Sequence, residues 1–350
     1  MAGSTTKRLY SLDCLRVLAV FMILYDHLGA LRNEEWVVKR GIDFLFAIPL
    51  HIIQDFGALG VAVFFVISGF LFAWNGGYKT VPARISRRVC KLYLSSLISF
   101  LGFWLFQMIC WNFFETYWHQ FSIRQWLESM TLAGYFTGNG EVVNGTTWFL
   151  VPLFFFYAVA SGYAFLAQKY RWKALWLIES FLGIFFYLLS VFENKLPTGL
   201  LVFIYLPFGG LILAEINKGS AGMIGNGIAL IVVNYLAMVM GFHRFSLEYY
   251  TQSPYLVSYL YAVLLVVLVL SWEKYFGPNR CVSFLCRISF AVYLLQMTWG
   301  GMLMQIFSDC GIPFTAGFML TVAAVFGIAW VHTRYVEERL LTRVLRGLKP

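Results

Sequence analysis

Long apolar stretches separated by short polar breaks make up almost the whole chain. A helix needs about 20 apolar residues to cross a bilayer, and runs of that length predict about ten membrane-spanning helices. The runs are longer than strands and lack the two-residue alternation of a β-barrel, so helices are the structure that we expect. The expected spans lie near residues 9–31, 57–74, 89–111, 147–168, 173–192, 199–215, 222–241, 255–272, 287–307 and 314–336.

Composition supports the same class. The 350 residues are 60% hydrophobic and 12% charged, with a mean hydropathy of +0.72. These values are typical of an all-α polytopic membrane bundle and not of a soluble domain. No repeat and no cleavable signal peptide is apparent, so we expect one integral-membrane domain over residues 1–350. The shorter stretch 42–56, interrupted by Pro49, is expected to be a re-entrant or interfacial helix.

Lysine and arginine are distributed very unequally between the two sides of the predicted bundle. Nineteen lie on one side and six on the other, and the richer side is cytoplasmic by the positive-inside rule. Both termini are therefore expected in the cytoplasm of a multi-pass cell-membrane protein. The net charge of +9 fits contact with anionic headgroups of the lipid bilayer and requires no nucleic acid. The six outer residues are Arg32, Lys39, Arg40, Arg124, Lys195 and Arg244.

The first apolar run contains two ionisable side chains, Arg16 and His27. Such residues are costly at membrane depth and mark a functional site by default. On an ideal helix they share one face, roughly 16 Å apart along the axis, which suits an elongated ligand held at one end and reacted at the other. Asp26 points about 100° away from His27. It either orients the imidazole through a local distortion or faces the outer polar cavity.

A second basic group, formed by Arg84, Arg87 and Arg88, opens the third span. Arg84 and Arg87 are neighbours one helical turn apart. Guanidinium groups bind phosphates through paired hydrogen bonds, so the group suits a nucleotide-like cosubstrate from the cytoplasm. The alternative is a positively charged membrane anchor.

Several familiar enzyme motifs are absent, among them GxSxG, a Walker loop, HExxH and a usable GxGxxG. Hydride transfer, ATP hydrolysis and zinc proteolysis thus have no support, and the cysteines lack metal-ligand spacing. His51 and Asp55 are either a metal or acid–base pair or polar residues of an interfacial helix. Cys110 and Cys310 both lie at outer ends of spans, where a disulfide could join them.

Five motifs in order resemble acyltransferase family 3, a family of integral-membrane O-acyltransferases. They are Arg16 followed by ten residues and His27; GALGVAVFFVISGFLF from Gly57; Arg84-x-x-Arg87; Trp148-Phe-Leu; and PNRCVSFLCRISFAVYLLQ, which ends at Gln296. The resemblance, together with the ten-span layout, covers nearly the whole chain. Trp148-Phe-Leu is similar to the WFL branch, which lacks the glutamate that other members carry in the fourth span.

The resemblance implies transfer of an acyl group, most often acetyl, from cytoplasmic acyl-CoA to a hydroxyl of an extracytoplasmic glycan or glycolipid. It gives His27 the role of catalytic base, with Asp26 beside it, and requires no metal. The expected cosubstrate-binding residues are Arg16, Arg84, Arg87, Arg88, Gly57, Gly60 and Ser68, although the small residues could equally serve helix packing. The expected acceptor-binding residues are Trp148, Glu141, Tyr293 and Gln296.

Gln296 departs from the family, because many members have a histidine there. Glutamine can form hydrogen bonds but cannot act as a base, which weakens any second-histidine role. The outer loop 112–146 is rich in aromatic and acidic residues, including Trp126, Tyr135 and Glu128. These suit either sugar binding or an interfacial belt.

Two functions without chemistry remain as alternatives: a transporter of acyl groups or polysaccharide intermediates, and a structural subunit of an export assembly. The effect of losing His27 distinguishes them from an enzyme, since an enzyme needs this base and transport alone should tolerate its loss. The sequence is also compatible with an oligomer.

Overall fold

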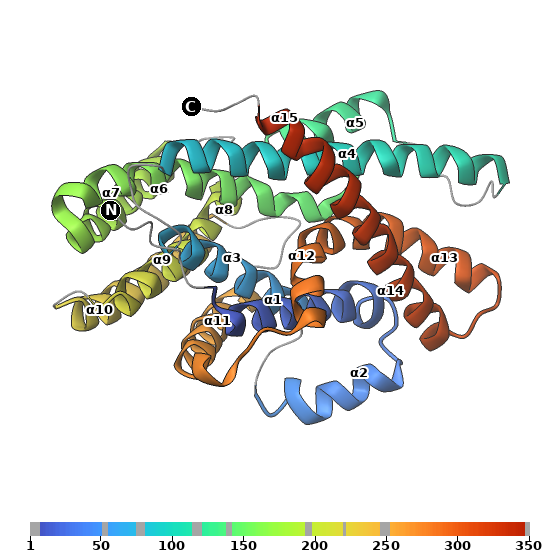
Figure 1. The fold of residues 1–350 in the computed structure, drawn as a ribbon, viewed down its shortest axis with the longest axis horizontal. Helices are drawn as coiled ribbons and strands as arrows, with labels where there is room; N and C mark the ends of the chain where they lie inside the picture. Colours follow the sequence, from blue (N-terminus) through green and yellow to red (C-terminus); the bar gives the residue numbers. More distant parts are fainter. Residues whose placement is uncertain are drawn as a thin grey trace. The chain divides into compact units, whose positions relative to one another are not determined.

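A computed structural model describes residues 8–50, 55–74, 81–113, 121–137, 142–192, 198–219, 222–245 and 253–346. Figure 1 shows their helices in chain order. Within these ranges the backbone is overwhelmingly helical and contains no strand. The prediction of an all-α membrane bundle is therefore confirmed.

Eight helical stretches are long and apolar enough to cross a membrane in the described part of the chain. One of them, Gly145–Val191, contains two predicted spans, α6 (Leu150–Tyr170) and α7 (Ala174–Val191). The first predicted span is α1 (Tyr10–Leu24) with a π-helical turn after it, and it is not among the eight. The count of ten stays a prediction. The other seven stretches are Phe56–Trp74, Ile85–Cys110, Thr198–Asn217, Met223–Arg244, Pro254–Ser271, Arg280–Asp309 and Phe314–Leu345.

The described chain divides into two compact units, each assembled from three separate segments. The first unit comprises Met1–Arg16, Val61–Ser86 and Leu150–Pro278. The second comprises Val17–Gly60, Arg87–Phe149 and Asn279–Pro350.

The first unit includes α6, α7, α8 (Thr198–Leu201), α9 (Tyr205–Asn217), α10 (Met223–Arg244) and α11 (Ser253–Ser271). Helix α3 (Phe56–Trp74) crosses α9 so closely that Gly69 lies against the Pro207 backbone and Gly210 against Val66. Small residues allow such approaches in a membrane, where packing holds helices together. The start of α1 is stabilised by Glu273, whose carboxylate accepts hydrogen bonds from the Tyr10 and Ser11 amides at 3.1 and 3.0 Å.

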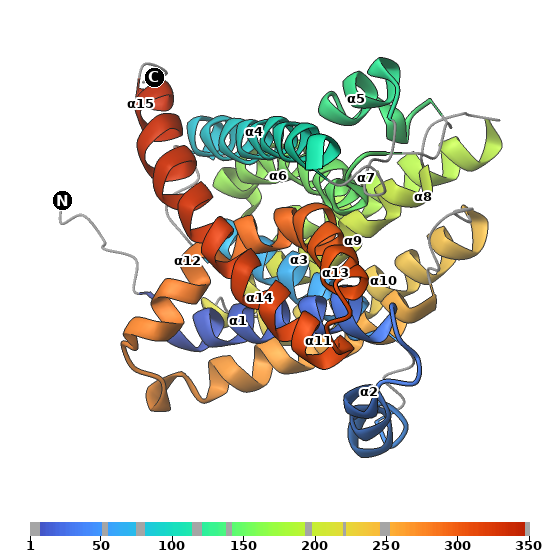
Figure 2. The ribbon, with the colours of Figure 1, turned by 90° about the vertical axis from the view of Figure 1, so that its right-hand side faces the viewer.

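The second unit is built around α12 (Arg280–Leu295), α13 (Gly301–Asp309) and α14 (Phe314–Val331), followed by the π-helical segment η11 (His332–Leu341) and α15 (Thr342–Arg346). Figure 2 shows α14 beside α12 and α13, in agreement with their residue contacts. Helices α4 (Val81–Phe113) and α5 (Ile123–Met130) contribute to the same unit.

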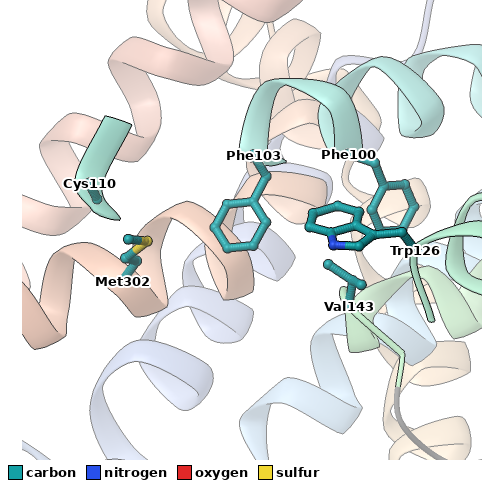
Figure 3. Packing of buried hydrophobic residues seen from close by; sticks show 6 residues of the cluster. All are labelled: Phe100, Phe103, Cys110, Trp126, Val143 and Met302. Carbon is teal, nitrogen blue, oxygen red and sulfur yellow. The ribbon is translucent and has the colours of Figure 1, made fainter. Parts of the chain in front are cut away.

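An aromatic cluster joins α4 and α5 (Figure 3). Phe100, Phe103, Cys110, Trp126, Val143 and Met302 are all buried in it. Trp126 packs against the rings of Phe103 and Phe121. Cys110 is thus enclosed while Cys310 is exposed, and both are free thiols. The disulfide considered between them is not present.

The segment after the first span differs from its prediction. Helix α2 (Val37–Ile42) and a π-helical turn (Asp43–Ala47) precede Pro49, where a single helix over 42–56 was expected. Pro49 has no amide hydrogen to continue the helical bonding. Trp36 fixes the segment by contacting Phe314 and Phe318. Several large apolar side chains are exposed here, as an interfacial helix requires: Phe44, Leu45, Phe46, Ile48 and Leu50.

Candidate functional site

A π-helical turn, η1 (Tyr25–Ala30), carries both Asp26 and His27. The Leu31 amide donates to the Asp26 carbonyl at 2.9 Å, a bond that spans five residues. The α-helical spacing of 100° per residue therefore holds only as far as Leu24, and the shared face calculated for Arg16 and His27 does not extend into this turn. Single π-helical turns are frequent at functional sites.

His27 contacts Gln296 through its ring. The Gln296 side-chain amide lies 2.6 Å from Nδ1 of His27, and Gln296 is completely buried. It is the first residue of a second π-helical turn, η10 (Gln296–Gly300), which packs against η1. The residue that replaces the family histidine thus lies directly against the imidazole.

This contact can leave one imidazole nitrogen available for chemistry. An amide nitrogen and oxygen exchange places by a half-turn of the group. With the oxygen facing His27, the amide accepts a hydrogen bond from Nδ1–H, and Nε2 then carries the free electron pair. In that arrangement the imidazole is a base with a fixed orientation.

Asp26 lies on the other side of the ring. Its Oδ2 is 4.0 Å from Nε2 of His27, and the residue is only 2% exposed. Among the described residues this oxygen has no hydrogen-bond partner. The local distortion that would bring Asp26 towards His27 is therefore present, as the π-helical turn.

Gly57 holds Asp26 next to a second carboxylate, that of Asp55. A Cβ atom at residue 57 would lie 2.6 Å from Asp26 Oδ2 and 2.9 Å from Asp55 Oδ1. Asp55 also caps helix α3, accepting from the Ala58 amide at 2.6 Å. Only glycine leaves room for both carboxylates. Gly60, one turn later, packs against Ala19 and Ile23.

A cavity of about 650 Å³ adjoins Asp26. Apolar side chains form part of its wall, and its volume falls in the usual range for a small-molecule site, about 300 to 1,000 Å³. Its polar and aromatic lining residues in the described part of the chain are Tyr25, Asp26, Glu34, Lys39, Asp43 and Phe56.

The predicted cosubstrate residues lie on three helices. Arg16 is half-buried on α1, and Ser68 is buried on α3. On α4, Arg87 is exposed and Arg88 is half-buried. Arg84 is in the first turn of α4, and its side chain lies outside the described part of the structure.

The predicted acceptor residues have structural contacts. The Tyr293 hydroxyl donates to the Thr146 carbonyl at 2.9 Å, and its ring packs edge-on against Phe149. Trp148 is buried in the same 3₁₀ segment, Gly145–Phe149. These contacts tie that segment to α12, which leads into Gln296. Glu141 lies outside the described residues, as does His51.

The loop 112–146, predicted to lie outside, uses its candidate sugar-binding residues in internal contacts wherever it is described. Trp126 is in the aromatic cluster, and the Tyr135 hydroxyl lies 2.9 Å from Thr147 Oγ1. Glu128 accepts from Arg124 at 2.7 Å. These groups stabilise the loop.

Three residues near the imidazole were not expected there. Asp55 faces Asp26, Tyr25 lines the cavity, and Arg32 donates to the His27 carbonyl at 3.3 Å. The sequence offered one indication, the Asp55-Phe-Gly57 start of the second predicted span, where a short acidic residue is a typical helix cap. Nothing local indicated that this cap would meet Asp26.

A second buried polar group in this unit surrounds His332. Ser95 Oγ lies 2.9 Å from Nε2 of His332 and donates to Glu337 Oε1 at 3.2 Å. The other oxygen of Glu337 is 3.1 Å from Nζ of Lys91. This group, from Lys91 to His332, links α4 to η11.

Comparison with known families gives one result. No curated protein and no solved structure is significantly similar to the chain. A family model described as an acyltransferase domain matches residues 9–334, which include both π-helical turns of the site. The chain belongs to this acyltransferase family, acyltransferase family 3, and is an integral-membrane acyltransferase.

Proposed function

We propose that the protein transfers an acyl group, most often acetyl, from cytoplasmic acyl-CoA to a hydroxyl of an extracytoplasmic glycan or glycolipid. The observation that carries the proposal is the imidazole of His27, held by Gln296 at 2.6 Å within a π-helical turn next to a cavity. A neutral imidazole with one nitrogen engaged is suited to general-base catalysis.

The reaction needs one base and one leaving group. Nε2 of His27 takes the proton of the acceptor hydroxyl, and the hydroxyl oxygen attacks the carbonyl carbon of the thioester. The carbon–sulfur bond then breaks, the imidazolium returns the proton to the departing thiolate, and the products are the ester and free CoA. The negative charge of the Asp26 and Asp55 pair, in which Asp26 Oδ2 lies 4.0 Å from Nε2, favours the positively charged imidazolium that forms in between. Transfer through an acyl-imidazole intermediate uses the same residue as nucleophile.

Arg84, Arg87 and Arg88 are proposed to bind the phosphates of acyl-CoA at the start of α4, with Arg16 nearer the thioester arm. Arginine suits this role because its planar group forms two parallel hydrogen bonds to one phosphate. The exposure of Arg87 is consistent with a site that is reached from water.

This mechanism requires that the arginines lie inside the cell and the acceptor outside. An impermeant thiol reagent applied to intact cells should modify Asn139→Cys and leave Lys79→Cys unmodified, since the lysine and arginine distribution predicts opposite sides of the membrane for these positions. The reverse labelling would contradict the proposal, because acyl-CoA could not reach its arginines.

The alternative is a protein of the same family fold that carries acyl groups or polysaccharide intermediates, or supports their export, without chemistry of its own. Purified protein with radiolabelled acetyl-CoA and a panel of glycans separates the two. Ester on a glycan that depends on His27 supports the enzyme. Movement of label without ester formation, unaffected by loss of His27, favours the transporter.

A further inference from the structure

The cavity beside Asp26 has an unbalanced charge. Among the described residues, the carboxyl groups of Asp26, Glu34 and Asp43 line it together with one ammonium group, that of Lys39. Lys39 Nζ is 2.9 Å from Asp43 Oδ2, so this pair is neutralised within the wall. Glu34 remains, and so does the pair of Asp26 and Asp55, whose carboxyl groups lie so close together that they carry one negative charge between them.

Arg32 does not alter this balance in the wall. Arg32 is not a lining residue; its Nε donates to the His27 carbonyl, and its guanidinium lies 2.8 Å from where a Cβ of Gly301 would be. An anion in the cavity would lie close to the exposed carboxylate of Glu34 and to the negative charge of the Asp26 and Asp55 pair, and like charges at short range repel strongly away from bulk water.

Two buried oxygens at the cavity lack partners within the described chain: Oδ2 of Asp26 and the hydroxyl of Tyr25. Buried polar atoms of a folded protein normally have a hydrogen-bond partner, and exceptions point to a missing ligand or water. Asp26 Oδ2 can accept from a ligand hydroxyl or ammonium, and the Tyr25 hydroxyl can donate or accept. A molecule with several hydroxyl groups can form hydrogen bonds with both of these oxygens.

The wall also offers flat apolar surface. The rings of Tyr25 and Phe56 meet edge to face with centroids 5.8 Å apart, and both line the cavity. A pocket with aromatic faces and few polar atoms binds amphipathic ring compounds well. A sugar ring has this character, with C–H groups on its faces and hydroxyls at its edge.

We infer that this cavity is the acceptor site and that it selects uncharged or amino sugars over anionic ones. The inference rests on the proposed acyl transfer at His27 and adds the class of acceptor. Glu34 sets the selectivity from the exposed rim, whereas Asp26 binds the hydroxyl that reacts.

Three acceptors of equal size test it: a neutral hexose glycoside, the corresponding amino sugar and the corresponding uronate. We expect kcat/KM for the uronate to be at least tenfold below that for the neutral sugar. Glu34→Lys should reduce the preference for the neutral sugar over the uronate several-fold, because it replaces a repulsive charge at the rim with an attractive one. Glu35→Lys is the matched control: it makes the same charge change one residue away, at an exposed position paired with Arg40 and outside the cavity. Equal turnover of uronate and neutral sugar, or equal effects of the two variants, would overturn the inference.

Binding can be measured without transfer. In a His27→Asn background, Ile48→Cys places a thiol on the exposed cavity rim, and mass spectrometry of its peptide reports alkylation by a maleimide. The neutral and amino sugars should protect this thiol and the uronate should not. Protection by all three or by none contradicts the selectivity. Selective protection in a protein whose wild type transfers no acyl group would instead refute the proposed function and leave the binding site standing.

Discussion

Two histidines of the second unit lie on π-helical segments, His27 on η1 and His332 on η11, yet their surroundings differ. Around His332, each oxygen of Glu337 has a partner, Ser95 on one side and Lys91 on the other. Around His27, by contrast, Asp26 Oδ2, Tyr25 Oη and Gln296 Oε1 are buried without partners in the described chain. A satisfied buried network stabilises a fold, while an unsatisfied one costs stability and points to a ligand.

The difference separates two uses of the same residue type. The group around His332 joins α4 to η11 and thereby fixes the helix that carries Arg87 and Arg88. The group around His27 leaves hydrogen-bonding capacity next to a cavity of about 650 Å³. Removing a residue from the first should affect folding, and removing one from the second should affect chemistry.

The largest expected effect follows from replacing each histidine by alanine. His27→Ala should reduce acyl transfer about 10²- to 10⁴-fold, the usual contribution of a general base, with little change in expression. His332→Ala should instead lower the thermal unfolding temperature, since it leaves Ser95 without one partner, and preserve turnover per folded molecule. Transfer rates normalised to folded protein measure this. If His27→Ala retained acyl transfer, His27 would have no role in the mechanism.

Gly57→Ala should reduce turnover on the order of a hundredfold, the cost of a misplacement of about 1 Å at a reacting centre. The added methyl group would meet the carboxylates of Asp26 and Asp55 at 2.6 and 2.9 Å and force them apart. Gly41→Ala is the control, because a Cβ there meets nothing within 4 Å. If both variants show wild-type kcat, the placement of Asp26 is irrelevant to the reaction.

Gln296→Ala should reduce kcat about tenfold, equivalent to the loss of one hydrogen bond of roughly 1.4 kcal/mol. Gln296→Glu should retain most activity, because its carboxylate still accepts a hydrogen bond from Nδ1–H of His27. The added negative charge should also raise the apparent pKa of the pH–rate profile. A purely structural role would not move that profile. Gln305→Ala, at an exposed position on the next helix, should match the wild type.

Arg87→Lys should give the smallest change, a several-fold rise in KM for acyl-CoA at constant acceptor KM. Lysine keeps the charge and the topology but loses the planar group that binds phosphate through two bonds. Arg339→Lys, in the last turn of η11, controls for membrane anchoring. Unchanged acyl-CoA kinetics in Arg87→Lys would leave the anchor as the better account of this arginine.

The sequence predicted the helical class and located the long apolar helices, because runs of apolar residues report directly on membrane burial; it did not predict the short helix α5. It also singled out Asp26, His27 and Gln296. It did not predict that Gln296 would contact His27, since the two residues are 269 positions apart and no local pattern encodes such a pairing.

The π-helical turns account for the rest of the difference between the predicted and the observed geometry around His27. An ideal helix separates Asp26 from His27 by about 100°, and their actual 4.0 Å separation depends on a five-residue hydrogen bond that hydrophobic spacing does not indicate. The second carboxylate, Asp55, reaches Asp26 only because Gly57 has no side chain. From the sequence, a glycine in a membrane span is explained equally well by ordinary helix packing.

The most direct test of the central claim is a product measurement in proteoliposomes that contain purified protein, with radiolabelled acetyl-CoA on the arginine-rich side and a neutral glycan on the other. We predict O-acetyl ester on the glycan in equimolar amount to the CoA released, and neither product with His27→Asn, which keeps hydrogen bonding but loses basicity. Ester formation at the wild-type rate by His27→Asn, or CoA release without any ester on the glycan, would contradict the account.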